Sequence, residues 1–126
     1  MKELTKAEEQ IMQYLWKLEK AFLKDIIEEF PNPRPAYTTI STVVRVLVKK
    51  GFIGFKTYGK VNQYYPLVSK KVYTRDFMKG VLKSFFNDSV GGFTSFFAKE
   101  QDLSLSELEE MKSLIEDQIK NKKENE

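Results

Sequence analysis

The sequence of 126 residues contains no cysteine, no histidine and a single tryptophan. Without Cys or His, a chain cannot form a Cys/His zinc site, a thiolate nucleophile, a Ser-His-Asp triad or an iron–sulfur cluster. It also lacks an apolar run near the roughly 18 residues of a membrane-spanning helix, and its start does not resemble a signal peptide. These absences predict a small cytoplasmic protein that is not an enzyme, holds no metal or other cofactor and does not insert into a membrane.

Acidic residues are missing from the middle of the chain. Residues 1–29 carry 5 basic and 7 acidic side chains, residues 30–75 carry 9 basic and none acidic, and residues 76–126 carry 7 basic and 11 acidic. A polyanionic partner such as nucleic acid would explain nine cations without an opposing carboxylate. An ordinary solvated surface is the alternative, and the charge count alone does not decide between them.

Two short helices are expected ahead of this basic segment. Thr5 and Glu8 have capping-box spacing and precede apolar residues at helical spacing, which predicts a helix over about residues 5–19. A second apolar face predicts another helix over residues 22–30. Three prolines within residues 31–35 then prevent a continuous helix, so the chain is expected to turn there.

The third predicted helix, residues 37–50, has two different faces. One is apolar and ends before Gly51, as in a helix packed on a core. The other combines short hydroxyl side chains with cations, which suits the DNA major groove because short side chains let the helix approach base edges while cations reach phosphates. An ordinary surface helix is the alternative, but such helices usually contain Glu and Gln where this one has Thr, Ser and Val. The polar face consists of Thr38, Ser41, Thr42, Arg45 and Lys49.

Residues 52–67 alternate in character like two strands, with Gly59–Lys60 as a two-residue type II′ loop. This loop places Phe55 opposite Tyr64 and leaves Lys56 near a basic tip. Three helices followed by a hairpin is the order of a winged helix-turn-helix. The predicted fold is therefore mainly α with a small β-hairpin.

The chain is expected to divide into a winged-helix DNA-binding domain at residues 1–69, a helical dimerisation domain at 70–122 and a frayed tail at 123–126. In the second domain, a break around residues 87–92 and a short segment at 93–97 separate two helices. Three short helices cannot bury so many apolar side chains alone, which predicts an intertwined dimer, with a closed bundle within one chain as the alternative. The expected dimer interface consists of Phe77, Val81, Leu82, Phe85, Phe86, Phe93, Phe96, Phe97, Leu108, Met111, Ile115 and Ile119.

Four strings carry a family resemblance: Leu4-Thr5-Lys6-Ala7-Glu8-Glu9, Tyr37-Thr38-Thr39, Tyr64-Tyr65-Pro66-Leu67-Val68 and Gly91-Gly92-Phe93. Through them the chain resembles the BlaI/MecI/CopY-type family of penicillinase and methicillin-resistance repressors. The resemblance implies a winged-helix domain, a helical dimerisation domain, repression at palindromic operators, and a membrane sensor-transducer system as a further partner. Copper-responsive members carry C-terminal Cys pairs that this chain lacks, so copper is not expected as a ligand.

The DNA-contacting positions implied by the resemblance nearly coincide with the polar helix face. Base contacts are expected at Thr38, Thr39, Ser41, Thr42 and Arg45. DNA backbone contacts are expected at Tyr37, Lys49, Lys50, Lys56 and Tyr64, and the acid-free segment adds Arg34 and Lys60.

The sequence thus predicts a dimeric repressor with the helix 37–50 in the major groove and the wing 52–67 on the DNA backbone. The main alternative is a winged-helix protein-interaction module whose basic stripe binds an acidic partner. Sequence selectivity separates the two, because only base contacts specify a DNA sequence. An enzyme is a third interpretation, but the carboxylate pairs Glu28–Glu29 and Glu109–Glu110 are adjacent on their helices and do not converge.

Overall fold

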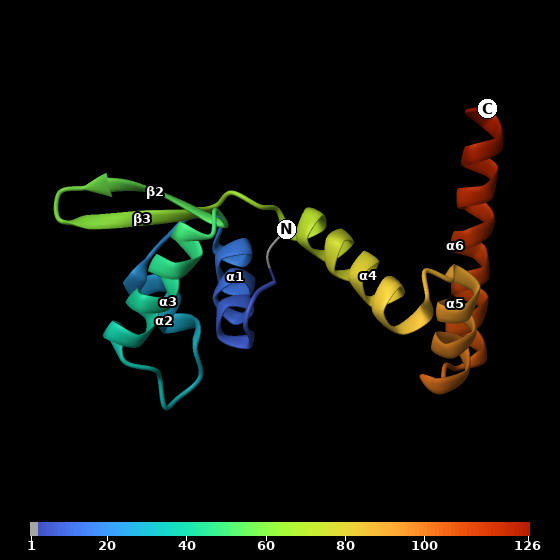
Figure 1. The fold of residues 1–126 in the computed structure, drawn as a ribbon, viewed down its shortest axis with the longest axis horizontal. Helices are drawn as coiled ribbons and strands as arrows, with labels where there is room; N and C mark the ends of the chain where they lie inside the picture. The colour runs from blue at the N-terminus through green and yellow to red at the C-terminus, as the bar shows by residue number, and fades with distance from the viewer. Residues whose placement is uncertain (1–2) are drawn as a thin grey trace. The chain divides into compact units, whose positions relative to one another are not determined.

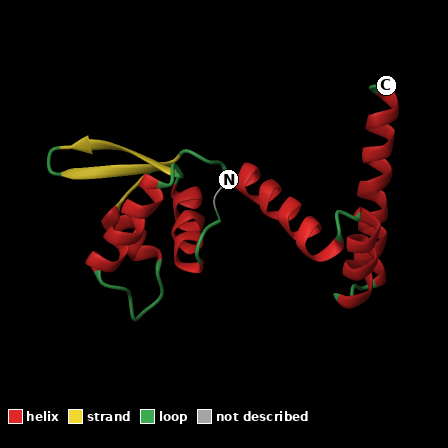
Figure 2. Ribbon diagram, in the orientation of Figure 1, coloured by secondary structure: helices red, strands yellow, loops and turns green. Residues whose placement is uncertain are grey.

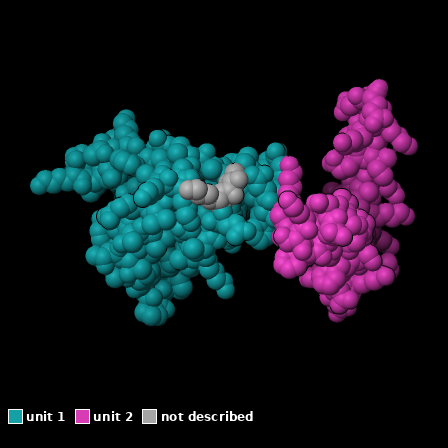
Figure 3. Space-filling model, in the orientation of Figure 1, with its two compact units in different colours: residues 1–77 teal, residues 78–126 magenta. Residues whose placement is uncertain are grey.

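The computed structural model describes residues 3–126, which form two compact units (Figure 3). The first unit ends at Phe77 and the second begins at Met78. The division therefore lies within helix α4 (Lys70–Phe86), whereas the domain boundary expected from the sequence coincides with the start of that helix. Across the described residues, no helix is both long and apolar enough to span a bilayer.

Three helices of the first unit lie close to their predicted positions. They are α1 (Lys6–Leu18), α2 (Leu23–Glu29) and α3 (Tyr37–Lys49) (Figure 1). The predicted capping box is present at the start of α1: Glu8 N donates to Thr5 Oγ1 at 3.2 Å, and Thr5 N donates to Glu8 Oε1 at 2.8 Å. These bonds satisfy two polar groups that the helix itself leaves unpaired.

The predicted hairpin is also present, as strands β2 (Ile53–Tyr58) and β3 (Val61–Pro66). Phe55 lies opposite Tyr64, as expected, and their ring centroids are 6.0 Å apart. Gly59 has a φ of +62°, the left-handed conformation that the first position of a type II′ loop requires and that Gly adopts without steric cost. The hairpin extends well beyond the helices (Figures 1 and 2).

A short strand that the sequence did not predict adds a third member to the sheet. This strand, β1 (Ala21–Phe22), pairs antiparallel with β3 and gives the order β1-β3-β2. Ala21 lies opposite Tyr64, so β1 joins the start of α2 to the hairpin. A strand of two residues has no visible alternation, which is why periodicity did not reveal it.

The hydrophobic core of the first unit lies between its helices and the root of the hairpin. Each helix contributes one apolar stripe, and α1 packs against α2, α3 and β3. The buried hydrophobic residues are Ile11, Met12, Leu15, Ala21, Ile26, Ile40, Val44, Leu47, Phe52 and Ile53. This core holds α3 and the hairpin in one rigid frame.

The second unit contains the end of α4 together with α5 (Val90–Glu100) and α6 (Leu105–Glu124). The break expected around residues 87–92 was wrong in its second half. Gly91 and Gly92 do not break the chain but lie in the first turn of α5, because Ser89 Oγ accepts a hydrogen bond from Gly92 N at 2.9 Å and caps the helix. The break comes earlier, at positive φ values of Asn87 and Asp88.

Helix α6 continues to Glu124, which lies within the segment 123–126 that was expected to be frayed. Lys122 and Lys123 lie in the last turn of α6. Cations at this position interact favourably with the negative end of the helix dipole, which explains the extension.

Candidate nucleic-acid interface

Helix α3 has the two faces that its sequence predicted. Ile40, Val44 and Leu47 are buried in the core. On the opposite side Thr38, Thr39, Thr42 and Arg45 are exposed and Ser41 is half-buried. The exposed side therefore presents short hydroxyl side chains and a guanidinium on a helix whose position the core determines.

The hydroxyl of Thr42 is already engaged within the helix. Its Oγ1 donates to the carbonyl oxygen of Thr38, one turn earlier, at 2.9 Å. In this arrangement the oxygen lone pairs and the methyl group of Thr42 are left for an external partner. Thr42 is thus suited to accept a hydrogen bond or to make an apolar contact.

A hollow of about 800 Å³ lies between α3 and the hairpin. Its walls come from three places: α3, the hairpin, and the segment 22–25 at β1 and the start of α2. The lining residues are Phe22, Leu23, Lys24, Asp25, Tyr37, Ser41, Arg45, Val48, Phe55, Lys60, Val61, Asn62 and Tyr64. The structure thus brings together Tyr37, Ser41, Arg45, Lys60 and Tyr64 from the predicted site.

The charged groups around the hollow are predominantly basic. Lys24, Arg45 and Lys60 line it together with one acid, Asp25, whose Oδ2 accepts a hydrogen bond from Phe22 N at 2.9 Å. Within residues 3–126, neither Arg45 nor Lys60 forms an ion pair. The hollow therefore offers free cations to an anionic partner.

Sequence reasoning missed the wall that segment 22–25 contributes, including Lys24, and it also missed Phe55 of the hairpin as a lining residue. Residues 22–25 reach the hollow because β1 pairs with β3. The only signal for this pairing was the tertiary contact itself.

Side-chain contacts also shape the tip of the hairpin. Thr57 Oγ1 and Asn62 Oδ1 are 2.7 Å apart across the strands, with the hydroxyl donating. The Nζ of Lys56 lies 5.3 Å from the centroid of the Tyr58 ring, a cation–π contact. Lys56 remains exposed, so its charge is available at the tip.

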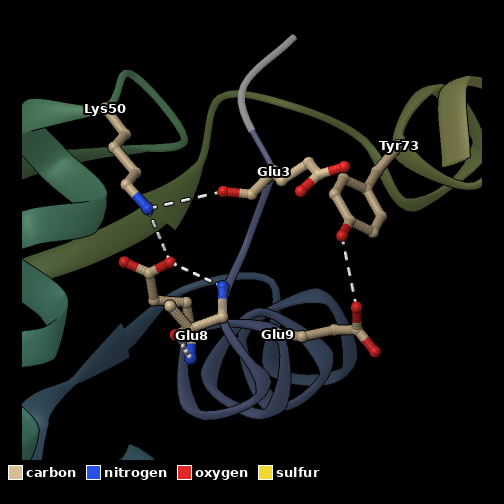
Figure 4. A network of polar contacts seen from close by, with 6 residues as sticks. Glu3, Glu8, Glu9, Lys50 and Tyr73 are labelled. Atoms are coloured by element: carbon tan, nitrogen blue, oxygen red, sulfur yellow. Dashed lines mark hydrogen bonds and ion pairs between the residues drawn. The ribbon is translucent and has the colours of Figure 1, made fainter.

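Lys50 differs from the other predicted backbone contacts because its ammonium is held inside the unit. Lys50 Nζ donates to Glu8 Oε1 at 2.7 Å, and Glu8 is buried (Figure 4). Burial raises the pKa of Glu8, but the hydrogen bond and charge of Lys50, together with hydrogen bonds from Thr5, outweigh it and leave the pKa below its ordinary value. This pair holds the end of α3 against the start of α1.

Arg34 also makes contacts within the unit. Its Nε donates to the carbonyl oxygen of Phe30 and its Nη2 to that of Glu28, both at 3.2 Å. The guanidinium therefore caps the last carbonyls of α2. Arg34 is exposed, so part of its guanidinium group still faces solvent.

The residues expected at a dimer interface fall in two places. Phe77 belongs to the first unit, where its ring stacks on that of Tyr73 with centroids 6.3 Å apart. The other expected interface residues belong to the second unit. The structure describes every residue of that unit, and none of them is buried. Phe85 is 77% exposed, while Phe86 contacts Phe93 at a centroid distance of 5.5 Å.

Comparison with known proteins places this arrangement in a family. The family model described as "Penicillinase repressor" matches residues 4–117, which is most of the chain. The chain belongs to the penicillinase repressor family. This membership confirms the resemblance drawn from the sequence, and the named members are regulatory proteins and repressors rather than enzymes.

Relatives match the chain over nearly its full length. The methicillin resistance regulatory protein MecI of Mammaliicoccus sciuri is 36% identical over 118 residues, covering 90% of this chain and 93% of the relative. The penicillinase repressor of Bacillus licheniformis is 25% identical over 123 residues, covering 97% of this chain and 96% of the relative.

A solved structure confirms the fold of the first unit. The solution structure of the DNA-binding domain of the repressor BlaI is 27% identical and superimposes with a TM-score of 0.50, covering 58% of this chain and 94% of that domain. The predicted fold class, a winged helix-turn-helix domain followed by a helical region, is therefore correct.

Proposed function

We propose that the protein is a dimeric transcriptional repressor that binds a palindromic operator, with α3 in the major groove and the hairpin on the DNA backbone. Family membership supports repression, and the DNA-binding domain of BlaI has the same fold as the first unit. The observation that carries the proposal for this chain is the surface formed by α3 and the hollow beside it. It combines hydroxyl groups with unpaired cations, which suits base edges flanked by phosphates.

The proposed base contacts are Thr38, Thr39, Ser41, Thr42 and Arg45, and the proposed backbone contacts are Arg34, Tyr37, Lys49, Lys56, Lys60 and Tyr64. Lys50 is left out because Glu8 already neutralises its ammonium. Lys24 is added because it lines the same hollow as Arg45. A DNA strand in this hollow would meet cations from three separate elements.

Dimerisation is assigned to the second unit, in which no residue is buried and every apolar side chain stays at least partly exposed. A two-fold axis would bury these faces on each other and present two copies of α3 to successive major grooves. A cytoplasmic location, a membrane sensor-transducer partner and the domain boundary after residue 69 stay predictions of the sequence and its resemblance.

The proposal is tested by selecting bound duplexes from random DNA with the purified protein and measuring the mass of the complex at moderate salt. A palindromic consensus bound by two chains, or by a multiple of two, is the expected result. Unselected sequences whose binding falls steeply with salt would contradict it and favour a basic surface that binds an acidic protein partner.

Arg45→Ala tests the assignment of base contacts. We expect a loss of about 1–3 kcal/mol in binding free energy on the selected operator and a much smaller loss on random DNA, because a base contact contributes only at the right base. Lys49→Ala, at the end of the same helix, is the matched control and should weaken both to a similar extent. Equal losses on the two DNAs for Arg45→Ala would make Arg45 a phosphate contact.

A further inference from the structure

Tyr73 attaches the start of α4 to the winged-helix core. Its ring centroid lies 5.7 Å from that of Trp16 and 6.1 Å from that of Phe52, which is buried. Its hydroxyl donates to Glu9 Oε2 at 3.2 Å. Figure 4 shows the phenol reaching across to Glu9 on α1.

Two further features keep this contact in place. Burial and the charge of Glu9 raise the pKa of Tyr73 to about 12, so the phenol stays protonated and can donate this bond well above neutral pH. Trp16 Nε1 donates to the carbonyl oxygen of Val68 at 2.8 Å, which ties down the segment just before α4. Rings and hydrogen bonds together therefore anchor the start of α4 at more than one point.

The anchor lies outside the proposed DNA contacts. Tyr73, Trp16 and Glu9 do not line the hollow between α3 and the hairpin. α4 is helical from Lys70 to Phe86, and its first residues, up to Phe77, belong to the same unit as Trp16 and Glu9. A linker held in one direction keeps two linked binding domains at one separation, whereas a loose linker lets them take many separations.

We propose that Tyr73 is a positioning residue for operator binding: by anchoring α4 on α1, it selects the spacing between the two half-sites that one dimer bridges. The inference rests on the dimeric operator binding proposed above. Without the anchor, each winged-helix unit would still read its own half-site. The pair of units would accept a wider range of spacings.

The test uses the full-length protein and duplexes in which two copies of the selected half-site are separated by a series of spacings. Two base pairs rotate one half-site by about 70° relative to the other. We therefore expect the wild type to bind its best spacing at least about 10-fold more tightly than spacings two base pairs away. Tyr73→Ala should reduce this ratio to about 3-fold or less, while affinity for a single half-site changes by less than about 2-fold.

Two further variants complete the test. Thr74→Ala, at the next and exposed position of α4, is the matched control and should keep the wild-type profile. Tyr73→Phe keeps the ring contacts and removes the hydrogen bond to Glu9, so it should give an intermediate ratio. A cooperative urea-unfolding transition, followed by the fluorescence of Trp16, the single tryptophan, shows whether each variant retains the folded winged-helix unit.

The outcomes separate this inference from the proposed function. A folded Tyr73→Ala protein with the wild-type spacing profile would overturn the positioning role and leave dimeric operator binding intact. If Tyr73→Ala does not fold, an unchanged spacing profile of Tyr73→Phe would overturn the positioning role instead. A wild-type protein that gains no affinity from a second half-site would overturn both proposals.

Discussion

The two units of the protein differ in how far they bury their apolar residues. The first buries ten hydrophobic residues in one core, while no residue of the second is buried, although that unit contains most of the expected dimer interface. Burying a large apolar side chain stabilises a fold by about 1.5–3 kcal/mol, so the first unit holds its stabilising contacts within one chain. The second unit exposes Phe85, Leu105 and Leu114 and can gain similar contacts from another chain. The two units therefore differ in whether their apolar side chains are covered within one chain.

Replacing one buried ring should have the largest effect on this comparison. Phe52→Ala leaves a cavity beside Ile53 and Tyr73 in the first unit, and we expect it to lower the free energy of unfolding by about 3–5 kcal/mol. Urea denaturation followed by Trp16 fluorescence measures this. The control is Phe85→Ala in the second unit, which should leave the same transition unchanged. A similar loss for both would mean that the units do not differ in packing.

A charge among the exposed apolar residues of the second unit should weaken dimerisation without changing the stability of the first unit. Phe85→Asp places a carboxylate where a partner chain is proposed to pack, so we expect dimerisation to weaken by about 2–4 kcal/mol. Sedimentation measures the dimer, and operator affinity should fall with it. The first unit should unfold as in the wild type. A dimer that survives this substitution would remove Phe85 from the interface.

The buried carboxylate of the first unit should make stability depend on pH. Glu8→Gln weakens the contact with Lys50, and we expect it to cost about 1–2 kcal/mol at neutral pH. Because folding lowers the pKa of Glu8, its contribution is fully present above the ordinary pKa and is lost as the pH falls through the folded-state pKa.

Urea titrations of wild type and Glu8→Gln between about pH 7 and pH 3 should therefore converge at low pH. Glu109→Gln, at an exposed position of the second unit, should behave as the wild type at every pH. A gap between wild type and Glu8→Gln that persists at low pH would show that the charge of Glu8 does not stabilise the fold.

The smallest expected effect concerns the exposed lysines. If each chain of the dimer neutralises about four phosphates, log affinity should fall with log salt at a slope of roughly −7, and Lys56→Ala should reduce the steepness by about 1–2. Lys99→Ala, an exposed cation of the second unit, should not change the slope. Identical slopes for Lys56→Ala and the wild type would remove the hairpin tip from the DNA interface.

Local patterns in the sequence determined most of the first unit. Capping residues, helical periodicity and Gly59 placed the three helices and the hairpin with its register, because each of these signals acts between residues close in the chain. The two faces of α3 followed from the same periodicity, which is why most of the proposed contact residues could be named from the sequence. Family strings then indicated a repressor.

Contacts between distant residues were decided by the tertiary structure. The pairing of β1 with β3, the hollow it helps to enclose, the ion pair of Glu8 with Lys50 and the anchor at Tyr73 join segments far apart in the chain. Periodicity reports which face of an element is apolar but not which element covers it. Only the folded chain therefore showed that one predicted phosphate contact, Lys50, is held by an internal carboxylate, because that pairing depends on how α1 packs against α3.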